Sequence, residues 1–185
     1  MLTLRCTQKA RKLLGVPFEQ ADDDPQRELT EWFVDTVIIE RRKSLLFMHK
    51  LTLYSFWVVG VRKAMLQDLH ELMLTHLENR LCLDGFPGSW ARLLGLGEGQ
   101  IRFAKTNDRR VVGSLSNHIG DSLHIIAYRG GLAFTNIDGL NAQLNKTPMG
   151  ALAPGKHMGY PIEALQKLLG LADASRAAGR SEREP

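Results

Sequence analysis

A change of hydrophobic pattern near Val61 constrains the fold of this chain more than any other feature. Before it, the stretches EWFVDTVIIE and SLLFMHKLTLYSFWVVG are rich in β-branched and aromatic residues, which are typical of strands. After it, apolar residues recur at steps of three and four until Asp84 and Gly85 end the pattern, at Met65, Leu66, Leu69, Leu72, Met73, Leu77 and Leu81. The sequence therefore predicts two or three antiparallel strands followed by one long amphipathic helix.

The other predicted elements are shorter. We expect tight turns at residues 41–43 and 49–52 to divide the strand region. LTLRCT alternates apolar and polar residues, as a half-buried strand does, and QKARKLLG is expected to form a helix that ends at Gly15. QIRFA is expected to be a strand. Two further helices are expected in NIDGLNAQLN, capped by Asn136, and in PIEALQKLLG, with Pro161 in its first turn.

The order of these elements indicates the fold class. Strands cluster early and helices dominate later, which favours α+β over a doubly wound parallel sheet. We predict a small antiparallel meander near the N-terminus packed against several helices. One domain is expected over residues 1–171, because 185 residues with 44% hydrophobic content suffice for one core. The tail over residues 172–185 has few apolar residues and is expected to be disordered.

Composition argues against several classes of protein. Cys6 and Cys82 are the only cysteines and show no CxxC or Cys/His spacing, so neither a disulfide nor a zinc site is expected. No cofactor motif is recognised, and a reducing cytoplasm is the expected compartment. The longest apolar run, LTLYSFWVVGV, is about half of the roughly 20 residues that a membrane helix needs. We therefore expect no membrane association.

The distribution of charge is more informative than its sum. A net charge of +4 and an isoelectric point of about 9.2 are only mildly basic. The basic residues nevertheless gather near the N-terminus, at residues 41–43 and at residues 102–110. This pattern permits a nucleic acid or another polyanion as a partner without requiring one.

The segment KTNDRRVVGSLSNHIGD, which starts at Lys105, holds the main candidate site. Thr106 or Asn107 is expected to cap a helix that begins at about Asp108. Helical geometry then gathers apolar residues on one side and a polar set on the other, namely Arg110, Ser114, Asn117, His118 and Asp121. The simplest interpretation of this polar set is the solvent-exposed face of an amphipathic helix.

The start of this helix supports a first functional interpretation. Lys105, Arg109 and Arg110 are expected beside the free N–H groups of the first helical turn. Because those groups carry the positive end of the helix dipole, the three cations would complete an anion site suited to phosphate.

A second functional interpretation is catalytic. His118 would act as general base for Ser114 one turn earlier, with Asp121 or Asn117 orienting the imidazole. A serine in the middle of a helix is poorly placed for this chemistry, because the helix already occupies the local N–H groups that an oxyanion would need. The catalytic interpretation is therefore the less favoured of the two.

The loop KTPMGALAPGKHMGY is a second-choice site, with Lys156 and His157 as its candidates. Long loops rich in glycine often carry function, although a loop that only wraps the core would look the same. His70 and His76 lack the i, i+4 spacing of a metal-binding pair, so no metal site is predicted.

Several segments resemble a family of small bacterial proteins known only as a domain of unknown function. They are MLTLRCTQK, DTVIIERRKSLLFMHKLTLYSFWVVGVRKAML, KTNDRRVVGSL, and LNKTPMG followed by YPIEAL, and together they cover most of the chain except the tail. The resemblance implies a bacterial cytoplasmic protein from a mobile-element or accessory-gene setting, and it implies no activity. The family pattern has Asn-Asp where this chain has Ser116 and Asn117, so a carboxylate is missing and a catalytic role is further disfavoured.

The sequence leads to one main hypothesis about function and two rivals. The main hypothesis is a non-enzymatic binding or regulatory module, toxin–antitoxin-like, that engages an anionic partner through the basic helix start. The first rival is an enzyme acting on a nucleotide or nucleic acid with His118 as general base. The second is a structural partner of another protein, recognisable by an exposed apolar patch along the long helix.

Overall fold

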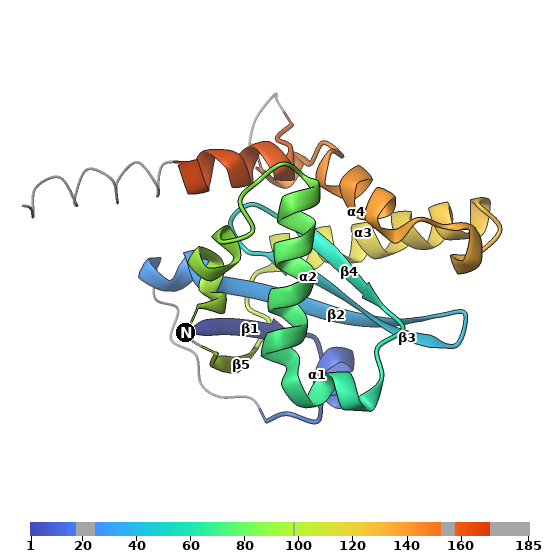
Figure 1. Cartoon of the computed structure of the whole chain (residues 1–185), viewed down its shortest axis with the longest axis horizontal. Helices are drawn as coiled ribbons and strands as arrows, with labels where there is room; N and C mark the ends of the chain where they lie inside the picture. Colours follow the sequence, from blue (N-terminus) through green and yellow to red (C-terminus); the bar gives the residue numbers. More distant parts are fainter. Residues whose placement is uncertain (18–24, 98, 153–157, 171–185) are drawn as a thin grey trace, which may run out of the picture.

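A mixed five-stranded sheet forms the centre of the molecule (Figure 1). The computed structural model describes residues 1–17, 25–97, 99–152 and 158–170. The strand order is β4-β3-β2-β1-β5, and the strands are β1 Leu2–Cys6, β2 Glu31–Ile39, β3 Arg42–His49, β4 Ser55–Val59 and β5 Ile101–Lys105. β2, β3 and β4 form an antiparallel meander, whereas β1 pairs in parallel with both β2 and β5. The predicted α+β class and its meander are confirmed.

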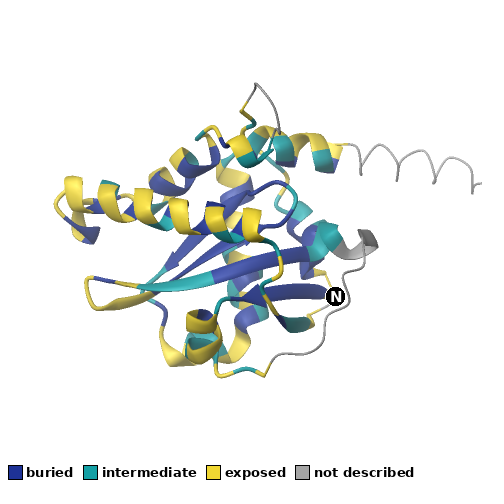
Figure 2. Ribbon diagram, turned by 180° about the vertical axis from the view of Figure 1, so that it is seen from behind, coloured by how far each residue is buried: buried dark blue, intermediate teal, exposed yellow. Residues whose placement is uncertain are grey.

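Helices cover both faces of this sheet (Figures 1 and 2). One face packs against α1 Gln8–Leu14, α2 Leu69–Leu83 and a helix over residues 161–170, and the other against α3 Arg109–Tyr128 and α4 Ile137–Asn145. Short helical turns lie at Pro25–Thr30, Lys63–Asp68, Arg92–Leu96, Leu132–Phe134 and Gly150–Leu152. Because side chains alternate along a strand, Trp32 belongs to the α2 core and its neighbour Phe33 to the α3 core.

The long helix that the apolar period predicts is confirmed as α2, with a later start. Residues Lys63–Asp68 form a 3₁₀ turn instead of the first α-helical turns. Asp68 then accepts a hydrogen bond from the Glu71 N–H at 2.9 Å, which fixes the beginning of the α-helix at Leu69. α3 spans 20 residues and is longer than α2, which spans 15.

The predicted capping residues lie at the observed helix ends, except at the start of α3. Gly15 adopts a left-handed conformation after α1, and Asn136 accepts a hydrogen bond from the Gly139 N–H at the start of α4, as predicted. The cap of α3 is Asp108, and the expectation of Thr106 or Asn107 is wrong. The Asp108 carboxylate accepts from the free N–H groups of Arg110 and Val111, because an aspartate reaches them as well as a threonine or asparagine does.

The predicted turn at residues 41–43 lies too late in the chain. Glu40 and Arg41, with φ of 46° and 67°, form a two-residue hairpin turn, so Arg42 and Lys43 already belong to β3. Such turns usually contain Asn-Gly or Asp-Gly, and Glu-Arg gives no comparable signal. The second turn is confirmed between His49 and Ser55.

None of the described helices has the length and apolarity that crossing a bilayer demands. The predicted tail over residues 172–185 lies outside the described residues.

Candidate functional site

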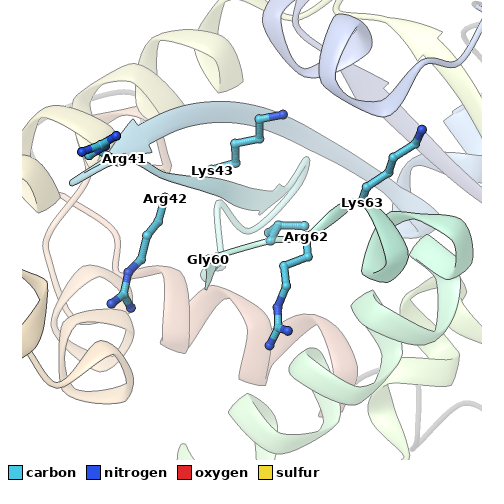
Figure 3. Close-up of a pocket in the computed structure, with 7 residues that line it drawn as sticks. Arg41, Arg42, Lys43, Gly60, Arg62 and Lys63 are labelled. Atoms are coloured by element: carbon cyan, nitrogen blue, oxygen red, sulfur yellow. The ribbon is translucent and has the colours of Figure 1, made fainter.

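A cavity of about 600 Å³ opens where β3 begins and β4 ends (Figure 3). Two short segments supply its walls, and their residues are Arg41, Arg42, Lys43, Gly60, Val61, Arg62 and Lys63. The Val61 N–H donates to the Lys43 carbonyl at 2.7 Å, which holds the second segment beside the first. Gly60 has a φ of +76°, a conformation that side chains rarely adopt and that turns the chain out of β4. We call this site the basic cavity.

The basic cavity concentrates positive charge from two chain segments. The five cationic side chains that line it are exposed, and no acidic residue of the described part of the chain is among its lining residues. The adjacent Glu40 carboxylate turns instead to the Leu132 N–H, which it binds at 2.8 Å. Figure 3 shows the guanidinium groups of Arg42 and Arg62 pointing to one side, while Lys43 and Lys63 point to the other. Such an array suits a ligand that carries several separated negative charges.

Sequence reasoning found only half of this site. The sequence shows the basic run at residues 41–43, whereas Arg62 and Lys63 lie where its hydrophobic pattern becomes helical. Pairing of β3 with β4 brings the two segments together, and that pairing was itself predicted as a meander. No local signal sets the register that places Arg62 and Lys63 beside residues 41–43, so the sequence alone does not bring the two sets of charges together.

The helix-start residues are less available for an anion than the sequence indicates. Lys105 and Arg109 are exposed, but Arg110 donates to the Lys50 carbonyl at 2.7 Å and to the Ala151 carbonyl at 3.3 Å. The Asp108 carboxylate already binds two N–H groups of the first turn, including that of Arg110. An anion at this helix start stays a prediction that rests on Lys105 and Arg109.

A buried ion network, which sequence reasoning missed, lies close to this helix start. The Arg5 guanidinium binds the Glu31 carboxylate and also donates to the Lys105 carbonyl at 2.9 Å. Lys50 donates to the second Glu31 oxygen at 2.6 Å. Burial opposes the charge of Lys50, but its hydrogen bonds to Glu31 and Glu28 outweigh that effect and raise its pKa. The network joins β1, β2 and β5 to Lys50, whose carbonyl accepts from Arg110 of α3, and it leaves the Arg5 and Lys50 side chains no role in a surface site.

The interpretation of the polar side of α3 as a solvent-exposed face is wrong for its central residues. Ser114 is 5% exposed and His118 is 1% exposed. His118 Nδ1 lies 3.1 Å from Ser55 Oγ, and the Trp57 indole donates to Ser122 Oγ at 2.9 Å. The sheet thus offers polar partners to α3, so the helix buries part of its polar side as well as its apolar one.

The three predicted catalytic residues line one small cavity. Its volume is about 180 Å³, and its walls are Ser114, Asn117, His118, Asp121, Thr147, Pro148, Met149, Gly150 and Ala151. Burial lowers the pKa of His118 to about 4, against a weaker opposing effect of Asp121. Among the described residues His118 Nε2 has no hydrogen-bond partner, so no bond joins this base to the Ser114 hydroxyl. The catalytic role of Ser114, His118 and Asp121 stays a prediction.

The second-choice loop site stays a prediction. Lys156 and His157 lie outside the described residues. Within the described ranges, no three His, Cys, Asp or Glu side chains are grouped as a metal ion would require. Cys6 is buried, which raises its thiol pKa to about 12 and makes it a poor nucleophile.

Two buried histidines make the stability of the fold sensitive to acid. Burial lowers the pKa of both His49 and His118 from 6.5 to about 4. Between these pH values the two imidazoles bind protons in the unfolded chain and stay neutral in the folded chain, so acid favours unfolding. Between pH 7 and pH 5 we expect each ring to reduce the free energy of unfolding by about 2 kcal/mol. Urea unfolding followed by circular dichroism at the two pH values measures this loss.

The matched control uses another histidine of the same helix. His118→Phe should remove about half of the pH dependence, whereas the same change at the exposed His124 should leave it intact. Equal unfolding free energies of the wild-type protein at pH 7 and pH 5 would show that these rings titrate normally.

Comparison with known proteins places the chain in a family. No match was found among curated proteins or among solved structures. A family model covers residues 3–164, which confirms the resemblance seen in the sequence segments. The chain therefore belongs to DUF6933, a domain of unknown function.

Proposed function

We propose that this protein is a binding module for an anionic partner, specifically a nucleic acid, and that phosphates of the partner occupy the basic cavity. The observation that carries the proposal is the set of five exposed cations that two chain segments bring to one cavity, with no acid among its described lining residues. This keeps the partner class of the main sequence hypothesis but moves the principal contact away from the helix start. A regulatory role in a toxin–antitoxin-like accessory system remains part of the proposal.

The dimensions of the basic cavity favour several phosphates over one. Its volume of about 600 Å³ is far larger than a single phosphate requires, and its cations point in two directions (Figure 3). Exposed lysines and arginines bind phosphate backbones mainly by releasing counterions, so each contact adds to the salt dependence of binding. A nucleic acid strand supplies regularly spaced phosphates across such an opening.

Removing two cations tests the basic cavity directly. We expect Arg42→Ala with Arg62→Ala to weaken binding of a fluorescent 20-nucleotide strand and to reduce the slope of log K against log salt by about 1.5. The reason is that each lost phosphate contact removes roughly 0.7 to 0.9 from that slope. Anisotropy titrations between 50 and 200 mM salt measure both quantities.

A matched variant separates the two basic surfaces. Lys105→Ala with Arg109→Ala removes the same charge from the helix start and should leave the slope nearly unchanged. If this variant reduces the salt slope and Arg42→Ala with Arg62→Ala does not, the phosphate contact lies at the helix start. Absence of binding by the wild-type protein at 50 mM salt would end the proposal.

The rival enzyme hypothesis ranks second. In its favour, Ser114, His118 and Asp121 line one cavity. Against it, a histidine with a pKa of about 4 is a weak general base near neutral pH. It predicts that His118→Ala abolishes a turnover of a nucleotide or nucleic acid while circular dichroism shows an intact fold.

The third hypothesis, a structural partner protein, predicts an exposed apolar patch along α2. Among the described residues of this helix, Leu83 is the one large apolar side chain that is exposed. The rest of its apolar side packs against the sheet, so this surface gives the hypothesis little support.

A further inference from the structure

Two aromatic rings stand in the solvent where α3 turns toward α4. Tyr128, the last residue of α3, is 89% exposed, and Phe134, six residues later, is 76% exposed. Within the described parts of the chain, neither ring stacks on another aromatic ring. We call residues 128–134 the aromatic corner.

The aromatic corner is hydrogen-bonded to the β2–β3 hairpin. The Leu132 N–H donates to the Glu40 carboxylate at 2.8 Å, and a side chain at Gly131 would collide with that carboxylate. The Phe134 ring lies over Gly130, 3.6 Å from where a Cβ would stand. Glu40 directly precedes Arg41, so the corner and the basic cavity are neighbours on the surface.

The chemistry of this corner complements that of the basic cavity. Burying an aromatic ring stabilises a fold, so two exposed aromatic rings within seven residues form an unusual surface. The exposed Arg129 lies between them and adds a cation. Aromatic rings beside a cationic groove are the means by which proteins bind single strands, because bases stack on the rings while phosphates follow the cations.

We infer that Tyr128 and Phe134 form a base-stacking surface for single-stranded nucleic acid whose phosphates enter the basic cavity. The inference rests on the proposed function and adds the class of nucleic acid. A duplex keeps its bases stacked on one another and offers them no free faces, so the aromatic corner selects the single strand.

The experiment compares a 20-nucleotide oligothymidine with a 20-base-pair duplex by anisotropy. Tyr128→Ala with Phe134→Ala should weaken binding of the single strand about 30-fold, since each lost stacking contact costs roughly fivefold or more. Duplex affinity and the salt slope for both ligands should stay unchanged, because no charge is removed. Tyr128→Phe with Phe134→Tyr keeps both rings and should bind the single strand as the wild-type protein does.

The outcomes separate this inference from the proposed function. If Arg42→Ala with Arg62→Ala weakens single-strand binding and the ring removal does not, the stacking surface is refuted and the basic cavity stands. If neither variant changes binding, both fail. If the wild-type protein sediments as a dimer that ring removal dissociates, the rings contact a second copy of the chain, and the inference is overturned.

Discussion

Replacing Glu31 with glutamine is expected to lower the free energy of unfolding by about 3–5 kcal/mol, the cost of breaking a buried ion pair from one side. The Glu31 side chain is 6% exposed, and its carboxylate binds both the Arg5 guanidinium and the Lys50 ammonium. Glutamine keeps the shape of the side chain but removes the negative charge that both cations share. The Arg5 guanidinium and the Lys50 ammonium would then lie close together in the protein interior with no negative charge between them.

Glu28 provides a control for this prediction with the same chemistry in another environment. Its carboxylate also contacts the Lys50 ammonium, at 3.1 Å, but its side chain is 38% exposed. Water screens that pair, so Glu28→Gln should cost no more than about 1 kcal/mol. Urea unfolding at pH 7 measures both variants. Equal destabilisation by the two substitutions would mean that burial does not decide the strength of this network.

The local elements of this fold could be predicted because their signals lie within a few residues. Gly15, Asn136 and Pro161 mark helix ends or beginnings through their own backbone chemistry. The pairing of Thr3 with Arg102 in parallel strands has no such signal, because tertiary packing alone brings those residues together.

The candidate site shows the same division between local and distant information. Periodicity correctly placed Ser114 and His118 on one side of a helix, but it could not tell that this side faces Ser55 of the sheet. The charge run at residues 41–43 was visible, whereas its meeting with Arg62 depends on the register of β3 and β4. Exposed rings such as Tyr128 look like ordinary core residues in the sequence, because an aromatic residue is usually buried.

The outer edge of β4 depends on two asparagines of α4. Asn145 accepts from the Ser55 N–H at 2.8 Å and donates to the Ser55 carbonyl at 2.9 Å, while Asn141 accepts from the Trp57 N–H at 2.9 Å. Four residues of helix rise about 6 Å and two residues of strand about 6.6 Å, so the two side chains match the spacing of the strand groups. The amides thus replace the neighbouring strand that an edge lacks.

Replacing Asn145 with alanine is therefore expected to cost about 2–6 kcal/mol, because it leaves two buried polar groups of Ser55 without partners at roughly 1–3 kcal/mol each. Asn141→Ala leaves one such group, the Trp57 N–H, without a partner, and it should lower the free energy of unfolding by about half as much. Gln143→Ala, at an exposed position of the same helix, should change stability by no more than about 0.5 kcal/mol. Urea unfolding ranks the three variants.

Hydrogen exchange of the Ser55 amide then identifies the cause. It should lose its protection in Asn145→Ala under native conditions and keep it in Gln143→Ala. Retained protection together with full stability would mean that the strand edge does not need the asparagine. Loss of protection in a protein that remains folded would leave β4 with an unpaired edge, and such an edge pairs readily with another chain. Asn145→Ala should then also self-associate at concentrations where the wild-type protein does not, which sedimentation measures.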